Sequence, residues 1–128
     1  MFCLDADFII SVLKRDPKAL DLLSEIEAQG ALYISSVNVL ELYHTGGDLS
    51  SKRVKVLSDL LENLEVLPFD KGSALLAGRI GTELRRKGKI LSSMDLMIGA
   101  IALHNSMTLI TRNMKHCSRI DGLEITSW

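Results

Sequence analysis

The sequence predicts an α/β fold, in which a mostly parallel sheet of four or five strands lies between two layers of helices. Short runs of β-type residues alternate with longer runs of helical periodicity, and this alternation is typical of a parallel sheet covered on both faces. The chain has 128 residues and is 47% hydrophobic, which suits one domain over residues 1–128 with a buried core. Polar residues directly follow two of the apolar runs, at Asp5 and at 111–113. In parallel sheets, functional sites lie beyond the carboxyl ends of the strands, which is where these residues would be.

The first segment contains one expected strand and two expected helices. Residues 2–4 form a short apolar run, and residues 8–13 then carry apolar side chains on one helical face. Pro17 directly after Asp16 suits the first position of a second helix. We expect that helix to end at Gly30, because glycine favours the backbone conformation that follows a helix.

The middle segment contains two further strands. Residues 31–35 (ALYIS) predict the second strand, and Ser36 can cap the helix that follows it. Residues 45–50 are expected to form a loop, and residues 51–64 an amphipathic helix. The run EVLPF at 65–69 predicts the third strand.

The last segment contains two long helices and two strands. Asp70 can cap a helix that continues to about Lys87. Residues 94–105 form a helix that is apolar on nearly all sides, which predicts a central and buried position. Residues 108–111 and 123–126 predict the fourth strand and a short fifth strand.

Composition narrows the class of protein. The net charge is −1, so a nucleic-acid site would have to be a local basic patch. Cys3 and Cys117 do not make a disulfide framework, and free buried thiols in a reducing compartment are expected. No signal peptide precedes the first strand, and no apolar run approaches the roughly 20 residues that span a bilayer. We therefore expect a soluble, cytoplasmic protein without a membrane partner.

Three acids stand in apolar surroundings that do not suit an ordinary surface acid. Asp5 ends the first strand, Glu41 lies among apolar helical residues, and Asp95 opens the most apolar helix. Each has a local alternative: Asp5 can cap a helix, Glu41 can be an exposed helical acid, and Asp95 can be stabilised by the helix dipole. The dipole contributes only about 0.3–1 kcal/mol, which is less than burial of an unpaired carboxylate costs.

These three carboxylates would repel one another if the fold brought them to the same end of the sheet. A hard divalent cation relieves such repulsion, and a site of oxygen ligands suits Mg²⁺ or Mn²⁺. Such an ion can orient a water and stabilise charge on a phosphoryl oxygen. The three acids therefore indicate phosphodiester hydrolysis, although scattered acids alone are a weak signal.

Four stretches, taken in order and with their separations, resemble one known family. They are LDADFI at 4–9, SVNVLEL at 36–42, DLMIGAIAL at 95–103 and TLITRNMKHCSRIDGLEI at 108–125. Together they resemble the PIN-domain family, and more narrowly the VapC-type ribonuclease toxins of toxin–antitoxin pairs. The resemblance implies a PIN-like, Rossmann-like fold with a metal-dependent ribonuclease site at Asp5, Glu41 and Asp95. It also implies an antitoxin partner that binds along the early helices, and a homodimer.

The chain departs from this family at five positions. Ala6 stands where a Thr or Ser hydroxyl is usual, and Asp7 stands where Asn is usual. Asn113 or His116 occupies the place of a fourth acid, and Cys117 replaces a Phe. Two interpretations of Asp7 stay open: it supplies the missing charge, or it simply faces solvent.

Basic residues near the expected site suggest how RNA would be held. Arg112, beside the fourth strand, is expected to contact the substrate, and Arg85 and Arg86 in RRKGK are candidates for phosphate contacts, which position nucleic acid without reading its sequence. Ordinary solvated cations are the alternative. The histidines lack the spacing of a zinc set.

The sequence therefore supports one main function and two alternatives. The main one is a Mg²⁺- or Mn²⁺-dependent endoribonuclease, restrained by an antitoxin. The first alternative is a catalytically impaired PIN domain that serves RNA binding or assembly, which the changed fourth acid favours. The second is a PIN nuclease in RNA maturation, which would use the same chemistry.

Overall fold

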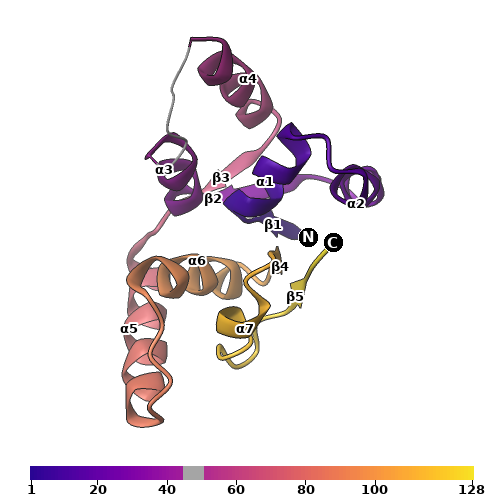
Figure 1. Ribbon diagram of the computed structural model, residues 1–128. Helices are drawn as coiled ribbons and strands as arrows, with labels where there is room; N and C mark the ends of the chain where they lie inside the picture. Colours follow the sequence, from indigo (N-terminus) through magenta and orange to yellow (C-terminus); the bar gives the residue numbers. More distant parts are fainter. Residues whose placement is uncertain (45–50) are drawn as a thin grey trace.

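A computed structural model describes residues 1–44 and 51–128, and its strands form one parallel sheet (Figure 1). The expected loop at 45–50 lies outside the described residues. All strand pairs are parallel, and the strand order is β3-β2-β1-β4-β5. The strands are β1 (Phe2–Leu4), β2 (Leu32–Ser35), β3 (Glu65–Leu67), β4 (Thr108–Ile110) and β5 (Ile125–Thr126). The predicted α/β class and parallel sheet are thus confirmed.

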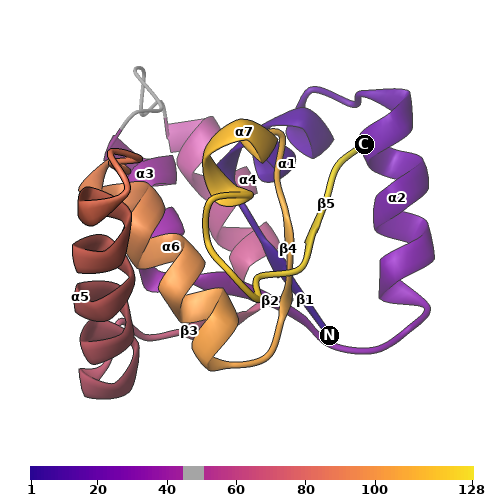
Figure 2. The ribbon, with the colours of Figure 1, turned by 90° about the horizontal axis from the view of Figure 1, so that it is seen from below.

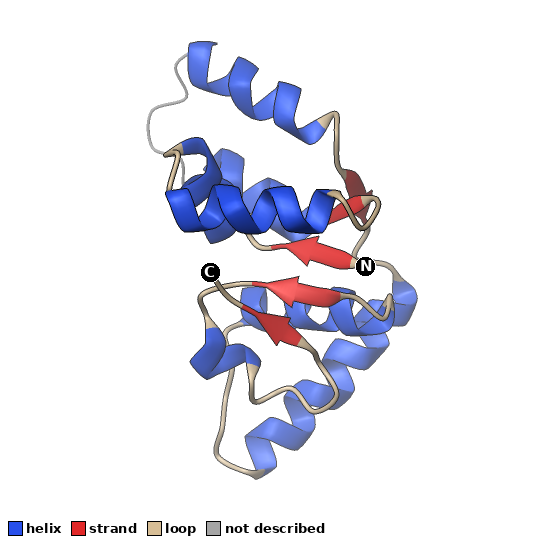
Figure 3. Cartoon of the chain, turned by 90° about the vertical axis from the view of Figure 1, so that its right-hand side faces the viewer, coloured by secondary structure: helices blue, strands red, loops and turns tan. Residues whose placement is uncertain are grey.

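Helices cover both faces of this sheet (Figure 3). Side chains alternate across a strand, so Leu4 and Ile110 join one buried cluster while Cys3 and Leu109 join the other. The first cluster receives α1, α2 and α4, the second receives α6 and α7, α3 contributes to both, and α5 packs on α6. The helices are α1 (Ala6–Leu13), α2 (Pro17–Glu27), α3 (Ser36–His44), α4 (Ser51–Leu61), α5 (Lys71–Arg86), α6 (Ser93–His104) and α7 (Met114–Cys117).

The helix ends confirm most of the expected capping. Asp16 accepts hydrogen bonds from the N–H groups of Lys18 and Ala19 with Pro17 at the first turn, and Asp70 accepts one from Ser73. Gly30 has a φ of 135° just after α2, a conformation that suits glycine.

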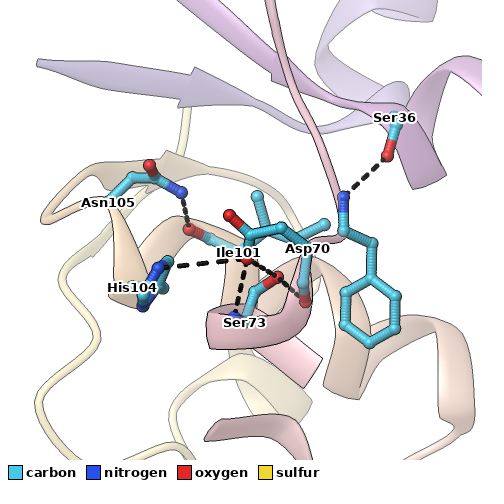
Figure 4. Close-up of polar contacts among 7 residues, drawn as sticks. Ser36, Asp70, Ser73, Ile101, His104 and Asn105 are labelled. Atoms are coloured by element: carbon cyan, nitrogen blue, oxygen red, sulfur yellow. Dashed lines mark hydrogen bonds and ion pairs between the residues drawn. The ribbon is translucent and has the colours of Figure 1, made fainter. Parts of the chain in front are cut away.

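The predicted cap at Ser36 is wrong by one residue. The Ser35 hydroxyl accepts the N–H of Asn38 at 3.0 Å. Ser36 instead accepts the N–H of Phe69 at 3.2 Å, which joins the start of α3 to the segment after β3 (Figure 4). The four-residue helix α7 was not predicted, because a segment this short carries no periodicity.

The central strand β1 determines where a site can form. It lies between β2 and β4, in parallel with both, so the three strands end at the same edge of the sheet. The N–H of Asp5 donates to the carbonyl of Ile110 at 3.0 Å and extends this pairing past the end of β1. In Figure 2, α1, α7 and the start of α6 gather beyond this edge.

Two other expectations concern the thiols and the membrane. Cys3 and Cys117 are free and buried, as predicted, and burial, together with nearby carboxylates, raises the pKa of each thiol to about 12. No helix in the described residues is long and apolar enough to cross a bilayer.

Candidate carboxylate site

Asp5 lies at the centre of a network of hydrogen bonds beyond the end of β1. One carboxylate oxygen, Oδ1, accepts the N–H of Ala6 at 2.8 Å and the side-chain amide of Asn38 at 2.7 Å. The other, Oδ2, accepts the hydroxyl of Thr111 at 2.6 Å. Asp5 is therefore a helix cap, as the local interpretation expected, and it also receives donors from the segments that follow β2 and β4.

Asn38 is a site residue that the sequence analysis missed. It is fully buried in the first turns of α3, and its amide nitrogen donates to both Asp5 Oδ1 and Glu41 Oε2, the latter at 3.2 Å. Its amide oxygen accepts the Ser35 hydroxyl at 2.6 Å. One buried amide thus holds two of the three predicted acids. The stretch SVNVLEL contained a signal, because Asn38 lies three residues before Glu41 and on the same side of the helix.

Thr111 is a second site residue that was not predicted from the sequence. It is fully buried just after β4, and its hydroxyl accepts the N–H of Asn113 at 3.0 Å while it donates to Asp5. The family resemblance predicts a hydroxyl at position 6, where this chain has Ala6. Thr111 brings a hydroxyl to the same carboxylate from the neighbouring strand.

Asp95 and His116 form a second part of the site. Asp95 lies in the first turn of α6, where its N–H donates to the Ser92 hydroxyl at 3.1 Å. Its side chain is 24% exposed, so it is less buried than the apolar helix suggested. The carboxylate oxygen Oδ2 lies 3.6 Å from Nδ1 of His116. His116, which stands at a position where the family resemblance predicts an acid, therefore lies beside a predicted ligand.

Asp7 is half-buried and does not simply face solvent. Its Oδ2 accepts the backbone N–H of Arg112 at 2.9 Å, while its Oδ1 is buried without a hydrogen-bond partner among the described residues. The solvent-facing interpretation is therefore wrong. Asn113 lies at the N-cap of α7, and its side chain makes no capping hydrogen bond.

The carboxylates act on one another electrostatically. Burial raises the pKa of Glu41, and the charges of Asp5, Asp7 and Asp95 raise it further, against a hydrogen bond from Asn38 that lowers it. Burial likewise raises the pKa of Asp5, although its three hydrogen bonds offset part of that effect. Burial and the nearby Asp5 raise the pKa of Asp7 to about 6. This concentration of negative charge would be relieved by a cation.

The donor chemistry of the cluster fits a hard divalent ion. The predicted ligands are carboxylates, and oxygen donors suit Mg²⁺ or Mn²⁺. The Oδ1 of Asp7 is a further carboxylate oxygen, and it has no hydrogen-bond partner among the described residues. Among the described residues, no three His, Cys, Asp or Glu side chains are close enough together to hold a metal ion. The Asn38 amide donates hydrogen bonds to both Asp5 and Glu41 and lies between them.

The predicted RNA-contacting arginines fall in two places. Arg112 directly follows Thr111, and its guanidinium lies 3.2 Å from Asp16 and 4.4 Å from the ring centre of Trp128. Arg85 and Arg86 are exposed in the last turn of α5. They lie on a helix that packs on α6 rather than on the strands (Figure 1), so the structure does not bring them into the hydrogen-bonded cluster.

Comparison with known proteins places this geometry in a family. The PIN domain model matches residues 2–123. The chain is 30% identical over 129 residues to a protein of Salmonella typhimurium named tRNA(fMet)-specific endonuclease VapC, covering 99% of this chain and 97% of the relative. It is 29% identical to Ribonuclease VapC2 of Haemophilus influenzae over 99% of this chain and 97% of that one.

A solved structure agrees with these relatives. The crystal structure of VapBC2 from Rickettsia felis, bound to a DNA fragment from their promoter, contains a chain that superposes with a TM-score of 0.90. That chain is 25% identical, and the match covers 99% of this chain and 98% of the other. Divalent metals are generally required by ribonucleases of this fold. The chain belongs to the PIN-domain family, as a VapC-type member.

Proposed function

We propose that the chain is a Mg²⁺- or Mn²⁺-dependent endoribonuclease that hydrolyses RNA phosphodiester bonds, as the toxin of a toxin–antitoxin pair in the cytoplasm. The observation that carries this proposal is the buried amide of Asn38, which holds Asp5 and Glu41 together, while the charges of Asp7 and Asp95 raise the pKa of Glu41. Grouped carboxylates can hold a catalytic metal ion, which agrees with relatives that are named ribonucleases.

Each residue of the cluster has a proposed part. Asp5, Glu41 and Asp95 would hold the ion, with Asp7, Asn113 and His116 as accessory groups. When bound, the ion supplies a more acidic water and stabilises charge on the phosphoryl oxygen. The chain's own hydrogen bonds do the positioning, since Asn38 and Thr111 fix the direction of the Asp5 carboxylate.

RNA would be held by local cations, because the whole chain carries a net charge of −1. Arg112 lies beside the acids in the fold, because its backbone N–H donates to Asp7 Oδ2. Arg85 and Arg86 are exposed at the end of α5, so they would contact only RNA phosphates that lie away from the carboxylate cluster.

The antitoxin would bind a groove between α1 and α4. The groove encloses about 340 Å³, with Ile10, Leu13 and Val56 as its apolar floor and with Lys14 and Lys52 among its basic lining residues. An apolar floor with a basic rim suits an amphipathic segment that carries acids. Structures of VapBC complexes support such a partner, and a homodimer is part of the same proposal.

One observation favours a catalytically impaired RNA-binding module instead. The family resemblance places a fourth acid at residue 113 or at residue 116, and this chain has Asn113 and His116 there. This alternative predicts RNA binding without cleavage by the wild-type chain. A nuclease of RNA maturation would share the chemistry and differ only in its substrate.

The decisive experiment is RNA cleavage by the wild type and by Asp95→Asn, with added Mg²⁺, added Mn²⁺ or a chelator. We expect the substitution to lower cleavage by about 10²–10³-fold or more, as loss of a group that stabilises developing charge does. Asp121→Asn is the matched control, because Asp121 is 89% exposed. Equal cleavage by Asp95→Asn and the wild type would contradict the proposed site.

A further inference from the structure

Arg112 is held on two sides by residues distant in sequence. Its Nη2 donates to Asp16 Oδ2 at 3.2 Å, and its guanidinium lies over the ring of Trp128, 4.4 Å from the centre. A cation over an aromatic face is attracted by the negative face of the ring. The side chain of Arg112 is therefore anchored within the protein, although 49% of its surface remains exposed.

Trp128 makes its contacts through the indole ring and not through the indole nitrogen. The indole packs edge-to-face on Phe8, with ring centres 5.0 Å apart and an angle of 72° between planes. The indole nitrogen is buried without a hydrogen-bond partner among the described residues, which is unfavourable. The position of Trp128 is thus explained by its contacts with Phe8 and Arg112.

Both of these contacts lie next to Asp7. Phe8 follows Asp7 in α1, and the backbone N–H of Arg112 donates to Asp7 Oδ2. The residue before Arg112, Thr111, holds Asp5. Residues 111 and 112 therefore each orient one carboxylate of the cluster, and a shift of this short segment would move both.

We propose that Trp128 and Asp16 are positioning residues: they anchor the Arg112 side chain, so that its backbone N–H orients Asp7 as the fourth carboxylate of the cluster. The inference rests on the proposed metal site. It assigns Arg112 a role in building the site, in addition to the RNA contact predicted from the sequence. It also explains how a chain without the usual fourth acid can complete its ligand set.

The first test measures the affinity of the full-length chain for Mn²⁺ alone, by calorimetry. We expect Trp128→Ala to weaken Mn²⁺ binding by about tenfold, as substitutions behind a metal ligand do. Trp128→Phe keeps an aromatic face and should stay within about threefold of the wild type. The thermal unfolding midpoint without metal is measured alongside, because a merely structural role would lower that midpoint and leave the Mn²⁺ affinity unchanged.

The second test uses two aspartates with the same local role. Asp16 and Asp70 both cap helices, and serine is an equally good cap. Asp16→Ser removes the partner of Arg112, so we expect it to weaken Mn²⁺ binding by about threefold or more. Asp70→Ser is the matched control and should leave the affinity unchanged.

The outcomes separate this inference from the proposed function. Unchanged Mn²⁺ affinity in both Trp128→Ala and Asp16→Ser overturns the inference, as does the absence of Mn²⁺ binding by the wild type. If the wild type binds Mn²⁺ but cleaves no RNA, the proposed function fails and the positioning role stands. Trp128 is the only tryptophan in the sequence, so its fluorescence in Arg112→Leu reports independently whether the ring contact exists.

Discussion

Asp5 and Asp70 have the same local role but lie in opposite surroundings. Each precedes a helix and accepts a backbone N–H as its cap. Burial and a neighbouring acid raise the pKa of Asp5. Hydrogen bonds from Ser73 lower the pKa of Asp70, with a smaller contribution from His104, which lies 3.9 Å away (Figure 4).

The difference shows that the capping role of an aspartate does not determine its charge state. Capping depends on the first turn of one helix, whereas the charge state of the capping carboxylate depends on every element that meets it. Asp70, at the start of α5, is half exposed and faces a histidine. Asp5 lies at the edge where β1, β2 and β4 end together and faces other acids. Only the second setting favours binding of a cation.

The largest expected effect separates the two caps by activity. Asp5→Ser and Asp70→Ser both keep a hydroxyl that can cap, but only Asp5→Ser removes a proposed metal ligand. We expect RNA cleavage with Mn²⁺ to fall by about 10²–10³-fold or more in Asp5→Ser and to stay near the wild-type rate in Asp70→Ser. Comparable rates for the two variants would mean that Asp5 is only a cap.

A smaller but still large effect is expected on stability. Asn38→Asp replaces the amide that holds Asp5 and Glu41 with another buried carboxylate, and breaking a buried polar pair in this way costs about 3–5 kcal/mol. Urea unfolding in the presence of a chelator measures this loss. Asn63→Asp is the control, because the Asn63 side chain donates only to an exposed backbone carbonyl. Equal losses in the two variants would contradict the role of Asn38.

The smallest expected effect concerns pH. The pKa of Asp7 is raised from its ordinary 3.8 to about 6, so between these values the folded chain binds more protons than the unfolded chain. Stability of the metal-free protein should therefore fall as pH rises through this window. The lowered pKa of Asp70 has the opposite sign, since its contribution is complete above the unfolded pKa and is lost as pH falls.

Asp7→Asn is the variant that checks this sign. Its free energy of unfolding, measured in urea with a chelator from about pH 4 to about pH 7, should fall less steeply with rising pH than that of the wild type. Parallel curves for the two proteins would contradict the raised pKa of Asp7.

The predicted acids could be found from sequence because each interrupts an apolar run. Asp5 follows a buried strand, and a parallel sheet brings such positions to one edge. Glu41 and Asp95 stand among apolar helical residues instead. The prediction that the three acids would influence one another therefore needed the apolar pattern of the helices as well as that of the strands. The degree of burial was less predictable, since the partly exposed side chain of Asp95 depends on how α7 lies beside α6.

The missed residues depend on contacts that periodicity does not encode. Thr111 donates to a residue 106 positions away, and Trp128 lies beside Arg112 only because β5 pairs with β4. Asn38 differs, because its signal was local: a buried amide among apolar residues needs partners, and Glu41 lies one turn further along the helix. The search for buried polar side chains that need hydrogen-bond partners is thus a useful second way to predict site residues, beside the search for acids.

The hydrogen bond between Asp5 and Thr111 has a consequence for how the protein is made. Asp5 and Thr111 are 106 residues apart, so the ribosome makes β1 long before one of its two neighbours, β4. Pairing across such a separation must wait for the distant partner. The carboxylate cluster can therefore assemble only after Thr111 has emerged from the ribosome, and a nascent chain that ends before this residue carries no finished site.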